Sequence, residues 1–73
     1  MLFRSSEATR ALANWTLDNG MERVALMIAP GNTGSLAVAA KAGFTFEGTL
    51  RNRGFVHSGR VDLTVWSRIP ADR

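Results

Sequence analysis

Residues 30–44, PGNTGSLAVAAKAGF, decide how the middle of this chain folds. The stretch begins with a Pro-Gly turn signal and continues with Asn32 and Thr33, which are good helix-capping residues. It ends with a glycine stop at Gly43. The residues between them predict a short helix from about Thr33 to Ala42. Asparagine, threonine and serine stand close together at its start, where they either cap the helix or also hold a ligand.

A longer helix is predicted before this stretch, over residues 5–19, with Gly20 as its C-terminal stop. Ala8, Leu12 and Trp15 recur at helical spacing and form one apolar stripe. We expect this stripe to face the core.

A strand is predicted over residues 23–29, RVALMIA. Its apolar residues occupy both parities, so we expect both faces of the strand to be covered. A strand buried in this way usually has a parallel neighbour that is joined to it through a helix. We therefore expect the chain to start in the middle of a fold, with that neighbouring strand preceding the first helix.

Two further strands are predicted near the C-terminus. Residues 44–50 (FTFEGTL) and 61–69 (VDLTVWSRI) alternate between apolar and polar, and Phe44 and Phe46 share one face. Residues 51–60 (RNRGFVHSGR) are polar and contain two glycines, which indicates a hairpin connection. The order helix–strand–helix–strand–strand is typical of the α/β class.

Length and composition exclude several classes of protein. A chain of 73 residues is at most one small domain. With no cysteine and a single histidine, His57, it lacks the residues for disulfides, thiolate metal sites or a His-rich cluster. No apolar run approaches the roughly 20 residues that span a bilayer, and Met1–Arg4 is too short for a signal peptide. We expect a cytoplasmic protein with no metal and no membrane association.

Three short motifs stand in order after the residue 23–29 strand: Asn32-x-x-Ser35, Lys41-Ala42-Gly43-Phe44 and Glu47-Gly48-x-Leu50-Arg51. Their order and spacing resemble the GNAT acyltransferases, above all the branch that acetylates ribosomal-protein N-termini. Asp62 and Trp66-Ser67-Arg68 fit the last strand of that family, and the match runs from Ser6 to Arg68. The resemblance implies the C-terminal half of a GNAT fold with a mixed sheet, residues 1–73 being a partial N-acetyltransferase domain.

This resemblance also implies a function. A full-length GNAT enzyme transfers an acetyl group from acetyl-CoA to a primary amine, here a protein N-terminus or a small molecule, and dimers are common in the family. A complete domain begins with further strands and helices that complete the cofactor cradle and shape the acceptor pocket. We therefore expect this chain to be a fragment of such an enzyme and to be inactive alone.

The resemblance assigns roles to four residues, and each has a simpler alternative. Asn32 would bind the pantetheine of the cofactor, and Ser35 would lie near the sulfur and protonate the departing thiolate. Asn32 is also a good N-cap, Ser35 could merely fill the first turn, and the two roles are compatible. Ser6 either binds a phosphate or only caps its helix. Lys41 either reaches the adenosine phosphates or only suits the helix C-terminus.

The sequence also departs from the family pattern. It contains no tyrosine, the usual general acid on this helix, which leaves Ser35 or a water. Met1–Arg4 stands in place of the glycine-rich pyrophosphate loop and has no glycine. Because the leading Leu-Phe-Arg-Ser (residues 2–5) is what a common sequencing-adaptor end encodes, we expect residues 1–4 to be non-native. Glu47 is either a distant base or a salt-bridged strand residue.

The alternative function is a non-enzymatic small basic α/β module that binds nucleic acid or completes a partner's sheet. The net charge is +3, and arginines concentrate loosely at Arg51, Arg53 and Arg60. This pattern is typical of a solvated surface, but it also fits a patch for nucleic acid or a phosphorylated ligand. Phe44 and Phe46 alternate like core residues and not like an exposed stacking row. The sequence therefore favours the enzyme over nucleic-acid binding.

Overall fold

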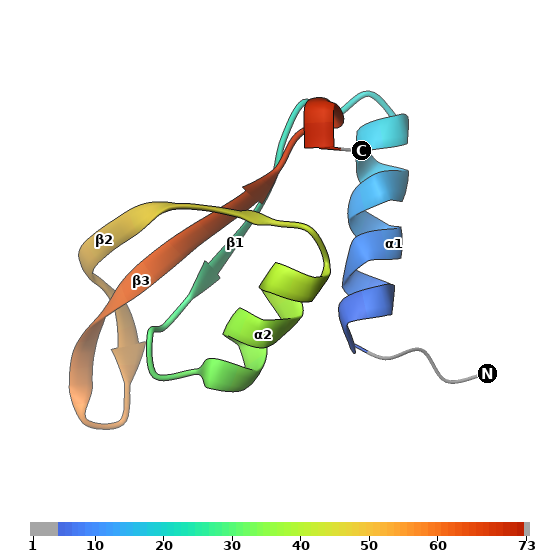
Figure 1. Ribbon diagram of the computed structural model, residues 1–73. Coiled ribbons are helices and arrows are strands. Elements are labelled where there is room, and N and C mark those ends of the chain that lie inside the picture. Colours follow the sequence, from blue (N-terminus) through green and yellow to red (C-terminus); the bar gives the residue numbers. More distant parts are fainter. Residues whose placement is uncertain (1–4, 73) are drawn as a thin grey trace.

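The computed structural model describes residues 5–72, so the expectation that residues 1–4 are non-native falls outside the described part. The chain forms, in order, α1 (Ser5–Asp18), β1 (Val24–Ile28), α2 (Thr33–Lys41), β2 (Thr45–Val56), β3 (Gly59–Arg68) and a short 3-10 helix η1 (Pro70–Asp72) (Figure 1). This confirms the predicted order of elements. No helix in the described range is long and apolar enough to cross a membrane.

The three strands form one sheet in the order β1-β3-β2, with β3 in the middle. Every pairing within residues 5–72 is antiparallel, and β1 aligns with β3 from Val24 opposite Arg68 to Ile28 opposite Thr64. Both helices lie on one side of the sheet, α2 across it and α1 beside α2 (Figure 1). The core therefore lies between this face and the two helices. The outer edge of β1 is free of any described strand.

The expectation that both faces of β1 are covered is wrong for the described residues. Val24, Leu26 and Ile28 pack against the helices, whereas Ala25 and Met27 on the opposite face are exposed. Met27 is 58% exposed. Apolar residues on both parities are compatible with either arrangement, and only the layers above and below the sheet decide between them.

The predicted apolar stripe of α1 points away from the core. Leu12 and Trp15 are 65% and 63% exposed, while Ala13 and Leu17, one helical turn apart, are buried. Ala13 belongs to the same core cluster as Ala39 of α2, which is fully buried. Small side chains let the backbones of two helices approach closely, which fits Ala13 on the inner face of α1, whereas Leu12 and Trp15 face outward.

The β2–β3 hairpin is longer than the sequence predicts. Residues 51–60 were expected to be a connection, but β2 continues to Val56 and β3 begins at Gly59, which leaves a two-residue turn. The pairing is irregular around Asn52, where φ is 56° and the backbone N–H donates to Asp62 Oδ1 at 2.9 Å. A two-stranded ribbon in solvent needs no apolar face, so polar residues do not exclude it.

The two phenylalanines expected to share the core differ in burial. Phe44 is buried at 6% exposure, whereas Phe46 is 51% exposed. The Phe46 ring meets Trp66 edge-on, with centroids 5.3 Å apart and planes inclined by 60°. Trp66 packs against the core cluster, and Phe46 extends this contact outward on the neighbouring strand.

Arg68 is a buried cation that joins three elements. Its side chain is 2% exposed, its Nε donates to Asn14 Oδ1 of α1 at 3.2 Å, and its Nη1 donates to the Gly43 carbonyl at 3.0 Å. Gly43 comes directly after Ala42, the C-cap of α2, at the helix end where the dipole places partial negative charge. The end of β3 is thereby tied to α1 and to the α2–β2 connection.

Replacing Gly43 with alanine should destabilise the fold. Gly43 has φ +86°, and an added Cβ would overlap the Arg68 guanidinium. A side chain in this backbone region costs about 1–3 kcal/mol. Gly31→Ala is the matched control, since a Cβ there meets no atom within 4 Å. Urea unfolding should show a clearly lower midpoint for Gly43→Ala alone. Equal midpoints for the two variants would contradict the role given to Gly43.

Candidate functional site

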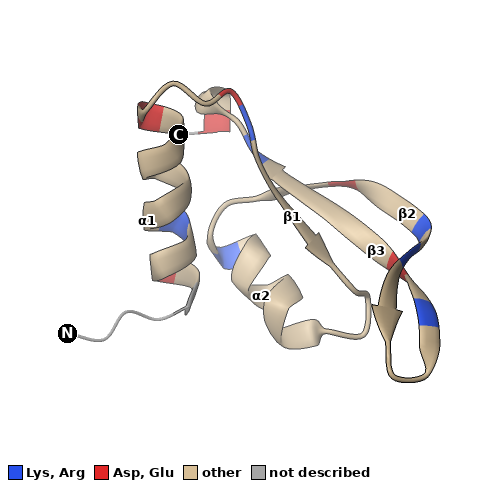
Figure 2. Ribbon diagram, turned by 180° about the vertical axis from the view of Figure 1, so that it is seen from behind, with Lys and Arg blue, Asp and Glu red and all other residues tan. Residues whose placement is uncertain are grey.

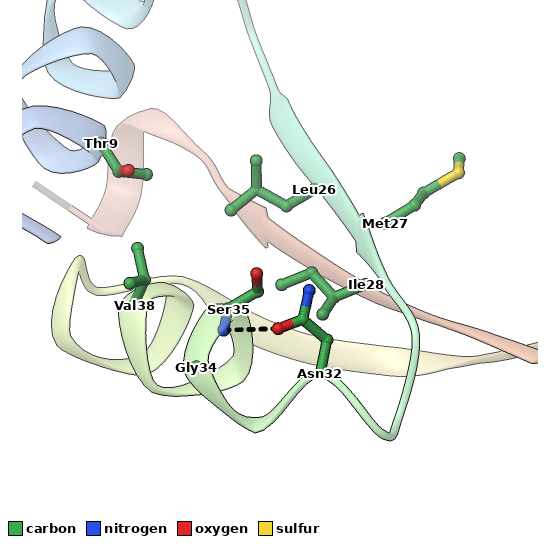
Figure 3. Close-up of a pocket in the computed structure, with 8 residues that line it drawn as sticks. All are labelled: Thr9, Leu26, Met27, Ile28, Asn32, Gly34, Ser35 and Val38. Carbon is green, nitrogen blue, oxygen red and sulfur yellow. Dashed lines mark hydrogen bonds between the residues drawn. The ribbon is translucent and has the colours of Figure 1, made fainter. Parts of the chain in front are cut away.

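A pocket of about 580 Å³ lies at the free edge of β1, between α1 and the start of α2. It is polar where α2 begins and apolar along β1 (Figure 3). Its lining residues are Thr9, Leu26, Met27, Ile28, Asn32, Gly34, Ser35 and Val38. The sequence placed Asn32 and Ser35 at one helix terminus, and the structure brings both into this pocket.

Asn32 caps α2. Its side-chain Oδ1 accepts a hydrogen bond from the Ser35 backbone N–H at 3.2 Å, and its carbonyl accepts one from Leu36 N–H at 3.0 Å. The amide oxygen of Asn32 is therefore engaged in the cap. Within residues 5–72 its amide nitrogen has no hydrogen-bond partner. Figure 3 shows this nitrogen directed toward the same space as the Ser35 hydroxyl. Capping and ligand binding thus use different atoms of one side chain.

The start of α2 offers several donors at once. Among residues 5–72, the half-buried Ser35 hydroxyl has no hydrogen-bond partner. The backbone N–H groups of Thr33 and Gly34 have none either, as is usual in the first turn of a helix. These groups and the positive end of the helix dipole favour an electron-rich ligand atom.

The other two predicted binding residues lie outside this pocket. Ser6 is half-buried in the first turn of α1, three residues before Thr9 and therefore on the same helix face. Lys41 is exposed in the last turn of α2, at the end opposite Asn32. Sequence reasoning missed Thr9, although its spacing from Ser6 was a usable signal, because the larger apolar residues of α1 indicated the wrong face.

Glu47 lies on the opposite side of the sheet, in a second hollow of about 460 Å³. Its Oε1 is 2.5 Å from Arg23 Nη2, and its Oε2 accepts a hydrogen bond from the Ser67 hydroxyl. These interactions, the Ser67 hydrogen bond first and then Arg23, hold the pKa of Glu47 below its ordinary value. A general base for an amine works best with a pKa near neutrality. The geometry favours the salt-bridged strand residue over the distant base.

Metal ligands do not gather in the described part of the chain. Within residues 5–72 no group of three or more His, Cys, Asp or Glu side chains could hold an ion. His57 lies exposed at the hairpin turn.

Solved structures provide a match that sequence comparison does not. No family model and no curated protein matches the sequence. A probable GNAT-family acetyltransferase from Chromobacterium violaceum has a TM-score of 0.83 and 31% identity. The match covers 93% of this chain and 34% of the Chromobacterium chain. RimL, a ribosomal L7/L12 alpha-N-protein acetyltransferase solved with coenzyme A, has a TM-score of 0.81 and 25% identity. The match covers 93% of this chain and 39% of the RimL chain.

A third structure is MccE, a microcin C7 self-immunity acetyltransferase in complex with acetyl-CoA and AMP. It has a TM-score of 0.81 and 26% identity, over 88% of this chain and 36% of its own. The chain thus spans less than half the length of the solved relatives it matches. These matches confirm the resemblance to GNAT acetyltransferases, ribosomal-protein enzymes included, and the C-terminal part of that fold.

Substitutions at Asn32 separate its capping role from its amide group. Asn32→Ala removes the acceptor and should lower the free energy of unfolding by about 1 kcal/mol. Asn32→Asp keeps an oxygen for the Ser35 N–H and should stay close to the wild type, because Asp and Asn cap equally well. Chemical denaturation measures both. An alanine variant as stable as the aspartate variant would show that the cap contributes nothing.

The lowered pKa of Glu47 predicts a pH dependence of stability. Its ionised form stabilises the folded chain above its ordinary pKa of 4.5, and this contribution is lost as the pH falls through the lowered folded-state pKa. The wild type should therefore exceed Glu47→Gln in unfolding free energy at neutral pH, and the gap should close in acid. Glu22→Gln, at an exposed site, is the control. A gap that is unchanged in acid would contradict the Arg23–Glu47–Ser67 arrangement.

Proposed function

We propose that this chain, which has the fold of the C-terminal part of a GNAT acetyltransferase, forms part of the acetyl-CoA site of an enzyme that acetylates primary amines. One observation carries the proposal: the Asn32 amide nitrogen and the Ser35 hydroxyl face one pocket at the free edge of β1. The solved relatives MccE and RimL support it, since they are complexes with acetyl-CoA and coenzyme A.

The residues present suit a ligand of this chemistry. Pantetheine is a narrow chain with amide groups, which need donors and acceptors spaced along their length. The Asn32 amide nitrogen would donate to a ligand carbonyl, and the free edge of β1 offers unpaired backbone groups. Leu26, Ile28 and Val38 supply the apolar wall for the methylene groups. A pocket with a few convergent polar groups on apolar walls is the usual form of such a site.

Acetyl transfer forms a C–N bond to the amine and breaks the C–S bond of the thioester. The amine loses a proton and the thiolate gains one. In this proposal Ser35, which lines the pocket, would donate a hydrogen bond to the sulfur as negative charge develops there and would protonate the departing thiolate. A thiol, with a pKa of about 8.5, is a far stronger acid than a serine hydroxyl. If Ser35 gives its proton to the thiolate, it must therefore take another proton from the amine or from water.

Ser6 and Lys41 are proposed to bind phosphates of the cofactor, and the position of Ser6 supports this role more directly than that of Lys41. Ser6 stands in the first turn of α1, where unpaired N–H groups favour a phosphate, and on the same helix face as the pocket residue Thr9. Lys41 lies at the far end of α2, where a cation also stabilises the helix C-terminus. A role of Lys41 at the adenosine phosphates requires a ligand that extends beyond the pocket along α2.

The acceptor is a protein N-terminus or a small amine, and turnover is proposed to need more of the fold than this chain supplies. The reason is coverage, because the chain matches only 34–39% of the lengths of RimL, MccE and the Chromobacterium enzyme. The chain alone is therefore expected to bind acetyl-CoA without completing the transfer.

Calorimetric titration with acetyl-CoA tests the site. Asn32→Asp keeps the cap but loses the amide donors, and should weaken binding about five- to tenfold, the value of one hydrogen bond. Ser35→Ala should bind within about twofold of the wild type, because its hydrogen bond strengthens only in the transition state. In a longer protein that turns over, it should lower kcat more than it alters KM. Ser58→Ala, at the exposed hairpin turn, is the matched serine control.

Two outcomes would overturn the proposal. Wild-type chain that does not bind acetyl-CoA would remove the cofactor site. Binding that is equally strong in the wild type and in Asn32→Asp would place the ligand elsewhere. An unchanged kcat in Ser35→Ala would reject only the role of the Ser35 hydroxyl and would leave the cofactor site in place.

A further inference from the structure

The far end of the β2–β3 hairpin carries an unbalanced positive charge. Arg51, Arg53 and Arg60 are all exposed, and no carboxylate within residues 5–72 lies at ion-pairing distance from any of them. Figure 2 shows these basic positions on the part of the hairpin that extends away from the helices. We call residues 51–60 the basic hairpin arm.

The structure of the arm holds the charge of Arg60 in place. The Arg60 guanidinium lies over the Phe55 ring, 4.3 Å from its centroid, and its Nη1 donates to the Asn52 carbonyl at 3.0 Å. The Asn52 N–H in turn donates to Asp62 Oδ1. The only carboxylate at this end of the hairpin that the structure describes is thus engaged with backbone and half-buried. Arg51 and Arg53 stand on either side of the fixed Asn52 and remain free to bind an anion.

The arm lies at the same end of the sheet as the candidate site. β1 ends at Ile28, opposite Thr64, and β3 extends from Thr64 back to Gly59, so the turn after β1 lies toward the end of the sheet where the hairpin projects (Figure 1). Asn32 and Ser35 follow this turn directly. The basic hairpin arm and the start of α2 therefore lie toward the same end of the sheet.

We propose that the basic hairpin arm docks an acidic segment of a polypeptide acceptor, an inference that rests on the proposed function and names its acceptor class. Three separate guanidinium groups along the hairpin match several carboxylates along a chain better than one small anion. Phe55 and Val56, 73% and 46% exposed, add apolar contact for side chains of that segment.

A nucleic acid fits the arm less well than a polypeptide. Proteins that bind single strands stack successive bases on a row of free aromatic rings. The arm has only two aromatic rings, Phe55 and His57 at the turn, and Arg60 already covers one face of the Phe55 ring. Phe46 and Trp66 pack against each other nearer the core. The arm thus offers charge without a stacking platform.

Fluorescence polarisation with a short peptide tests the inference. The probe has alternating glutamates, a free amino terminus and a dye at its C-terminus, and a second probe has glutamine at each glutamate. The wild-type chain should bind only the acidic probe, with an affinity that falls as salt rises. The double variant Arg51→Gln, Arg53→Gln should bind it about three- to tenfold more weakly, as expected for two exposed ion pairs. Arg10→Gln, which removes an exposed arginine of α1, should remain within about twofold.

The outcomes that overturn the inference are distinct. Equal binding of the acidic and glutamine probes, an equal loss in Arg10→Gln, or tighter binding of a single-stranded RNA of similar length would each reject it. Circular dichroism checks that the double variant folds, and the comparison of the two peptides on the wild type decides even if it does not. Acetyl-CoA binding should be unchanged in the double variant. Loss of acetyl-CoA binding with peptide binding intact would refute the proposed function and leave the arm as an anion-binding surface.

Discussion

The buried guanidinium of Arg68 is the constraint on which the arrangement of this chain depends. Removing a charge from water costs several kcal/mol unless its hydrogen bonds are replaced. Here the replacements come from Asn14 of α1 and from the Gly43 carbonyl at the end of α2. Because Arg68 ends the central strand, this pair of contacts fixes both helices relative to the sheet. The pocket lies along β1 between Thr9 of α1 and the start of α2, and Ala13 of α1 and Ala39 of α2 belong to one core cluster.

The candidate site follows from this frame and from one local motif. The turn after β1 places Asn32 at the start of α2, and the cap that it makes consumes only one of its two polar side-chain atoms. The remaining amide nitrogen and the Ser35 hydroxyl then face the space that the frame leaves open. A residue that stabilises a helix end can thereby also present a donor to a ligand. Glu47 illustrates the contrary case, since its hydrogen bonds with Ser67 and Arg23 favour its ionised form and engage both carboxylate oxygens within the sheet.

The parts of the fold that local chemistry decides could be predicted from the sequence. The short helix of residues 33–41, its asparagine cap and its glycine stop are signals within a few residues of each other, and so is the order of the elements. The pairing of Asn32 with Ser35 followed from the same spacing. The inner face of α1 could not be found in this way, because Ala13 makes the contact and the larger Leu12 and Trp15 do not. The open face of β1 and the length of the hairpin likewise depend on which layers are present, which no local pattern records.

The central claim is that the pocket beside β1 takes acetyl-CoA, and backbone amide NMR of the chain tests it most directly. On titration with acetyl-CoA, the account predicts that the shifted amides cluster at Thr9, residues 26–28 and residues 32–38, and that the exposed end of the hairpin stays unchanged. Shifts confined to residues 51–60 would show that the ligand's phosphates bind the arginines alone. That result, or the absence of any shift, would contradict the account.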